Sequence, residues 1–198
     1  MPTPAWLMEA RAKTGRAWLA TYGWTIDGEA PNVAKAVLCA APHTTNWDLP
    51  FTLAICWALG IELAWIGKNS LFKGAAGPFM RGLGGIAVDR SKRLNQVQSA
   101  AALFEQNDRL LLLVPPEGTR GRSDRWRTGF YYIALEAKVP IVLGYLDYAK
   151  KRGGFGEVFW PTGNIVDDEA RIREFYADKQ GKYPECTTPV YFAPTKSD

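Results

Sequence analysis

The chain contains one histidine, His43, and a carboxylate follows it five positions later at Asp48. Histidine is the side chain whose unperturbed pKa best suits proton transfer near neutral pH. A neighbouring carboxylate can hold one ring nitrogen as N–H and leave the other free as a base. An isolated pair at this spacing is more often a structural histidine in a tight loop, with the aspartate capping a helix. The pair therefore needs support from elsewhere in the chain.

A second polar segment, Pro116-Glu117-Gly118-Thr119-Arg120, follows the apolar run 109–114. Glycine lets a backbone approach a ligand closely, and a threonine hydroxyl with an arginine guanidinium suits a phosphate group. Glu117 is expected to orient the guanidinium of Arg120. Taken alone, such a basic loop is usually only a solvated surface.

A third segment, Gly84-Gly85-Ile86-Ala87-Val88-Asp89-Arg90-Ser91, also ends an apolar run in an arginine. Ligands of open α/β sheets collect at the carboxyl ends of the strands. We therefore expect His43, Arg90 and the loop 116–120 to converge on one edge of a sheet, which favours a binding site over three unrelated loops.

The order of apolar and amphipathic segments predicts an α/β fold, a single domain with a mostly parallel central sheet flanked by helices. At 198 residues the chain is one domain, residues 1–198, with its motifs in a core at 38–146. Strands are expected at 34–40, 62–66, 86–89, 109–114, 141–146 and 155–160. Helices are expected at 4–22, 48–59, 95–106, 128–137 and 167–177, with Asn46 or Asp48 as the cap of the second.

The composition excludes some classes of site. Three cysteines, none in a CxxC pair, argue against a disulfide framework and for a reducing compartment. One histidine and scattered cysteines leave little material for a metal site, so no metal is expected. The net charge of +4 suits an anionic partner without choosing among nucleic acid, phospholipid and coenzyme A. No nucleic-acid motif is present, so we expect no nucleic-acid partner.

Residues 1–22 form a candidate interfacial helix, in which Trp6, Ala10, Ala17, Trp18 and Tyr22 fall roughly on one side. Tryptophan with basic residues is typical of a helix on a membrane surface, whereas an apolar stripe packed on the core is the commoner arrangement. Both interpretations stay open. The longest weakly polar run, 51–61, is too short to span a bilayer. Together with the lack of a signal-peptide pattern, it predicts a cytoplasmic protein with at most peripheral membrane contact.

Four blocks in this order carry a family resemblance: His43-x4-Asp48, Gly85-Ile86-Ala87-Val88-Asp89-Arg90, Pro116-Glu117-Gly118-Thr119-Arg120 and Val139-Pro140-Ile141-Val142. Together they resemble the glycerophospholipid acyltransferase family, whose best-known members are lysophosphatidic acid acyltransferases. The resemblance covers about residues 38–146. The paired H-x4-D and P-E-G-T-R blocks are specific in this order and spacing.

The resemblance implies an acyl-thioester-dependent glycerolipid O-acyltransferase. In it, His43 is the general base that deprotonates the acceptor hydroxyl, and Asp48 orients it. Five residues would bind the phosphate of the acceptor: Arg90, Glu117, Gly118, Thr119 and Arg120. No cofactor is implied beyond acyl-CoA or acyl carrier protein as co-substrate. The expected partners are a lysophospholipid acceptor, such as 1-acyl-glycerol-3-phosphate, and the inner face of the cell membrane.

Two departures from the family pattern leave the acceptor open. The second block has Ala87-Val88 where a bulky or aromatic residue is usual, and the fourth continues with Leu143-Gly144 in place of a second proline. The same chemistry on another lipid alcohol or amine, or a noncatalytic lipid-binding module, are therefore alternatives. The apolar segment 51–59, with Trp57 and Trp65, either walls an acyl tunnel or fills the core.

Overall fold

The computed structural model describes residues 3–88 and 96–192 of the chain. Within them, seven strands form one sheet in the order β1-β7-β6-β2-β5-β3-β4. The strands are β1 (Thr25–Asp27), β2 (Lys35–Ala41), β3 (Leu63–Lys68), β4 (Gly85–Val88), β5 (Leu110–Val114), β6 (Ile141–Asp147) and β7 (Arg152–Phe159). The helices are α1 (Ala5–Tyr22), α2 (Asp48–Ala58), α3 (Ala76–Gly82), α4 (Gln96–Glu105), α5 (Gly129–Ala137) and α6 (Ile165–Tyr176), with 3₁₀ turns at Asn69–Phe72 and Pro184–Cys186.

The strand directions confirm the predicted α/β fold with a mostly parallel sheet. Strands β2 to β6 are mutually parallel, whereas β7 pairs antiparallel with β6 and β1 pairs parallel with β7. The expected strand at 155–160 in fact begins at Arg152, and the short edge strand β1 was not expected at all. The five parallel strands, β2 to β6, therefore point their carboxyl ends to one edge of the sheet.

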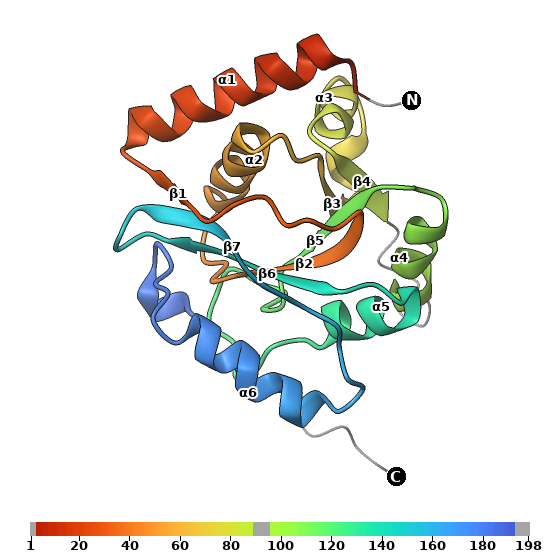
Figure 1. Cartoon of the computed structure of the whole chain (residues 1–198), viewed down its shortest axis with the longest axis vertical. Helices are drawn as coiled ribbons and strands as arrows, with labels where there is room; N and C mark the ends of the chain where they lie inside the picture. The colour runs from red at the N-terminus through yellow and green to blue at the C-terminus, as the bar shows by residue number, and fades with distance from the viewer. Residues whose placement is uncertain (1–2, 89–95, 193–198) are drawn as a thin grey trace.

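Helices cover both faces of the sheet (Figure 1), with α1, α2 and α3 on one side and α4, α5 and α6 on the other. Alternate residues of each central strand supply the two cores. In β2, for example, Val37 and Cys39 pack in the cluster that includes α4, α5 and α6, whereas Ala36 and Leu38 pack with α2. Strand β5 is apolar on both faces because helices bury both of its sides.

The N-terminal helix α1 lies on α2 rather than on the sheet (Figure 1). Its contact runs through the buried residues Gly15 and Leu19, and a Cβ at position 15 would come 2.4 Å from the carbonyl oxygen of Ala54. Glycine is therefore what lets the two helices approach so closely. Trp6, by contrast, is 70% exposed, and Ala10 and Ala17 are exposed with it, so these members of the expected stripe do not pack on the core.

Among residues 3–88 and 96–192, no helix combines the length and the apolar character needed to cross a membrane.

The register of the central strands brings the motif loops together. Cys39 of β2 lies beside Val114 of β5 on one side and beside Leu143 of β6 on the other. The chain segments that leave these three strands therefore begin side by side. They carry His43, Glu117 and a residue that the sequence did not single out, Tyr148.

Candidate active site

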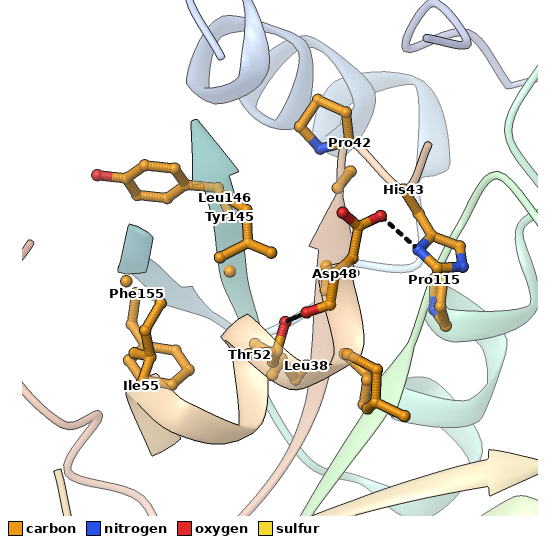
Figure 2. Close-up of a pocket in the computed structure, with 16 residues that line it drawn as sticks. Leu38, Pro42, His43, Asp48, Thr52, Ile55, Pro115, Tyr145, Leu146 and Phe155 are labelled. Carbon is orange, nitrogen blue, oxygen red and sulfur yellow. Dashed lines mark hydrogen bonds and ion pairs between the residues drawn. The ribbon is translucent and has the colours of Figure 1, made fainter. Parts of the chain in front are cut away.

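The carboxylate of Asp48 organises the loop that follows β2. Its Oδ2 atom accepts hydrogen bonds from His43 Nδ1 at 2.9 Å and from the backbone N–H groups of Thr44 and Thr45 at 3.0 Å each (Figure 2 draws the first). The expectation that Asn46 or Asp48 caps α2 is wrong. Helix α2 begins without a side-chain cap, because the carboxylate of Asp48 turns back to the preceding loop instead.

The hydrogen bond to Asp48 determines which ring nitrogen of His43 can accept a proton. A carboxylate only accepts hydrogen bonds, so the Nδ1 atom beside Asp48 carries the ring proton. The Nε2 atom makes no hydrogen bond to any residue of the described chain, 3–88 and 96–192, and the side chain keeps partial access to solvent. The geometry thus presents Nε2 as a proton acceptor toward an incoming group.

Tyr148 binds the other oxygen of the Asp48 carboxylate. Its hydroxyl donates to Asp48 Oδ1 at 2.8 Å, across one hundred positions of sequence. Burial raises the pKa of Tyr148, and the negative charge of Asp48 raises it further, so the hydroxyl keeps its proton and remains a donor. The position of Tyr148 in the sequence could have indicated this role. It directly follows β6, whose carboxyl end lies at the same edge of the sheet as His43.

An apolar pocket of about 50 Å³ opens beside the His43–Asp48 pair. It lies between α2 and the sheet, with Thr52 and Ile55 from α2 and Leu38, Leu113 and Phe155 from three strands among its walls (Figure 2). Of the segment 51–59, these two α2 residues line the pocket. The two tryptophans do not: Trp65 packs on Phe72, and Trp57 lies beneath the Arg11 guanidinium.

Glu117 is buried rather than displayed in a binding loop. The side chain is 1% exposed, and neither carboxyl oxygen has a hydrogen-bond partner. The pKa of Glu117 is raised to about 7, mainly by burial; the nearby His43 opposes the rise, and the charge of Asp48 adds to it. Neither carboxyl oxygen of Glu117 bonds to Arg120, so Glu117 does not orient that guanidinium as expected.

The rest of the loop after β5 is open to solvent. Gly118 has φ of 67°, and a Cβ there would come 2.4 Å from Nε of Arg127, so glycine lets this arginine lie against the loop. The backbone N–H of Arg127 donates to the carbonyl of Pro116 at 2.7 Å. Thr119 and Arg120 are exposed, and Arg120 makes no ion pair with any described residue. Arg90 lies outside the described residues.

The structure therefore brings together His43, Asp48 and Glu117 and places the exposed loop 118–120 at the same sheet edge. A model of the family described as Acyltransferase matches residues 25–143, more than half of the chain. This chain belongs to the Acyltransferase family. The matched range contains the histidine, the two carboxyl groups and the loop after β5.

A solved structure shows the same fold as this acyltransferase domain. The chain is similar to the crystal structure of the 1-acyl-sn-glycerophosphate (LPA) acyltransferase PlsC from Thermotoga maritima, with a TM-score of 0.59 and 18% sequence identity. The match covers 88% of this chain and 81% of that one. No match to this chain was found among curated proteins.

The buried carboxyl group of Glu117 predicts a pH-dependent stability. Its pKa is raised from 4.5 to about 7 in the fold, so the fold favours the neutral form. This raised pKa contributes about 3 kcal/mol to the free energy of unfolding. The contribution is fully present below the pKa of Glu117 in the unfolded chain and is lost as the pH rises through its pKa in the folded protein. In Glu117→Gln this dependence should disappear. Urea unfolding at about pH 5 and about pH 8 measures the difference.

Glu136→Gln is the matched control, because Glu136 is exposed. Its pH dependence should follow that of the wild type. If Glu117→Gln and the wild type lose the same stability between the two pH values, Glu117 is not held neutral by the fold.

Proposed function

We propose that this protein transfers a fatty acyl group from acyl-CoA or acyl carrier protein to the hydroxyl of a lysophospholipid such as 1-acyl-glycerol-3-phosphate. One observation carries the proposal: His43, held through Nδ1 by Asp48, offers a free Nε2 beside an apolar pocket. Membership of the Acyltransferase family supports the reaction class. The likeness of fold to an LPA acyltransferase supports the acceptor class.

The proposed reaction is a direct transfer. Nε2 of His43 takes the proton of the acceptor hydroxyl while the oxygen attacks the thioester carbon. The C–S bond then breaks, and the departing thiolate takes up the proton from the imidazolium. The products are an ester and a free thiol, and the histidine returns to its neutral state. Asp48 stabilises the imidazolium that forms in between.

Two of the three cysteines, Cys39 and Cys56, do not favour an acyl-enzyme intermediate. Cys39 and Cys56 are fully buried, and burial raises the pKa of each thiol, that of Cys56 to about 12. A thiol without thiolate character is a poor nucleophile. This supports the role of His43 as a base acting on substrate rather than on an enzyme nucleophile.

Two regions are proposed to bind the substrates. The pocket walls are aliphatic and aromatic, which suits part of an acyl chain close to the reacting carbonyl. The exposed Gly118, Thr119 and Arg120 are proposed to bind the acceptor phosphate, with Arg127 lying against them. Arg90 stays a predicted phosphate ligand. The buried Glu117 is proposed to interact with the loop that carries His43 instead of binding the phosphate.

A lipid surface is the proposed place of action. Beside His43 lie three exposed aromatic side chains and one exposed lysine, which together are called the aromatic rim: Tyr22, Trp47, Lys182 and Tyr183. The Lys182 ammonium lies 5.3 Å from the ring centre of Trp47 and 5.9 Å from that of Tyr183, and it pairs with no carboxylate of the described residues. Aromatic rings with an unpaired cation suit the headgroup region of an anionic bilayer.

Replacing the proposed base gives the first test. In His43→Ala, acyl transfer from acyl-CoA to lysophosphatidate should fall by about 10²- to 10⁴-fold, because the variant lacks the group proposed to accept the hydroxyl proton. Mass spectrometry of the lipid product measures the rate. Turnover equal to that of the wild type would contradict the mechanism.

In the same assay, Arg120→Ala distinguishes a phosphorylated acceptor from a nonphosphorylated one. A raised KM for the phosphorylated acceptor with unchanged kcat supports a phosphate contact. Unchanged kinetics with every phosphorylated acceptor tried would favour a nonphosphorylated lipid alcohol or amine. Binding of lipid without any transfer, to any acceptor, would favour the noncatalytic module.

The aromatic rim predicts charge-dependent membrane binding. The double variant Lys182→Glu with Tyr183→Ser should bind vesicles of phosphatidylcholine and phosphatidylglycerol about tenfold more weakly, since each basic residue near an anionic surface contributes about 1 kcal/mol. Co-sedimentation of the full chain with vesicles measures it.

Trp160→Ser is the matched control for the rim. Trp160 is 64% exposed but follows β7, which runs opposite to β6 and so ends at the edge away from His43. It should bind as the wild type does. Equal losses in both variants, or no loss in either, would exclude the rim as the membrane contact.

A further inference from the structure

The two oxygens of the Asp48 carboxylate have separate partners. Oδ2 is occupied by His43 and by the N–H groups of Thr44 and Thr45, all from the loop just before α2. Oδ1 accepts a hydrogen bond from a different part of the molecule, the hydroxyl of Tyr148 at 2.8 Å. Asp48 itself is 5% exposed, so protein groups take the place of water around it.

Tyr148 is held independently of that loop. It directly follows β6, and its backbone N–H donates to the carbonyl of Gln180 at 2.9 Å. Its ring meets Trp24 edge-on with centroids 4.8 Å apart, and Phe51 packs at 6.0 Å. Three segments outside the His43 loop thus fix where the hydroxyl points.

We propose that Tyr148 is a positioning residue for His43, acting through the carboxylate of Asp48. Without a donor at Oδ1, only the bonds at Oδ2, all from the loop before α2, oppose rotation of the carboxylate about its Cβ–Cγ bond, a torsion with broad minima. With the Tyr148 hydroxyl in place, Oδ2 is held toward Nδ1 and Nε2 is held toward the substrate. This inference rests on the proposed role of His43 as the base.

Among residues 3–88 and 96–192, two further ionisable groups act on this cluster. Glu117, from the loop after β5, acts on His43, and Tyr183, from the C-terminal segment, acts on Tyr148. Neither forms a hydrogen bond with Asp48.

The test is Tyr148→Phe in the full chain, which removes the hydroxyl and keeps the ring. Because the chain has one histidine, its ring C–H protons give an NMR signal that needs no assignment. In the variant the Asp48 carboxylate is held less firmly, so the His43 ring should occupy more than one orientation and its ring C–H signals should shift or broaden. For the same reason kcat should fall about tenfold with KM unchanged.

Tyr131→Phe is the matched control, since it removes another buried tyrosine–aspartate hydrogen bond, to Asp168 at 2.7 Å, in the core on the far face of the sheet. It should leave the ring signals of His43 unchanged. Unchanged ring signals in Tyr148→Phe, or equal changes in both variants, overturn the inference. If the wild type transfers no acyl group but the ring signals change only in Tyr148→Phe, the proposed function fails while the coupling of Tyr148 to His43 stands.

Discussion

The buried carboxylate of Asp48 is the constraint on which the site depends. A negative charge removed from water is stable only where donors replace the lost hydration. Here the donors are the ring of His43, two backbone N–H groups of its own loop and the hydroxyl of Tyr148. Satisfying this one charge fixes the loop backbone, the orientation of the imidazole and the nitrogen that faces the substrate.

The sheet makes this convergence possible. Since β2, β5 and β6 are adjacent and parallel, the segments after them meet at one edge although they are far apart in sequence. The same strands are mostly apolar, so a polar cluster at their carboxyl ends lies directly beside an apolar pocket under α2. A base next to a space for hydrocarbon is what acyl transfer between a thioester and a lipid hydroxyl requires.

The sequence predicted those features that depend on local pattern or on motif spacing. Apolar runs such as 109–114 gave the central strands, and the H-x4-D and P-E-G-T-R blocks pointed to the correct sheet edge. Three residues were too few for a periodic pattern, so β1 was missed. The fold class and the reaction class were thus within reach of the sequence alone.

What could not be predicted depends on tertiary contacts. Asp48 precedes a helix and so resembled a cap, but the donors that turn it toward the loop include a tyrosine one hundred residues away. Glu117 resembled a surface ligand because its neighbours are glycine, threonine and arginine, yet the packing at the sheet edge encloses it. Trp57 and Trp65 are as apolar as a tunnel wall, and only the packing shows that neither lines the pocket.

The most direct measurement of the central claim is a double-mutant cycle on acyl transfer with His43→Ala, Asp48→Ala and both together. If the two side chains act as one unit, the double variant should be no slower than the slower single variant. If the losses of the two single variants multiply in the double variant, the pair does not work together, and the account of Asp48 as the group that orients the base is contradicted.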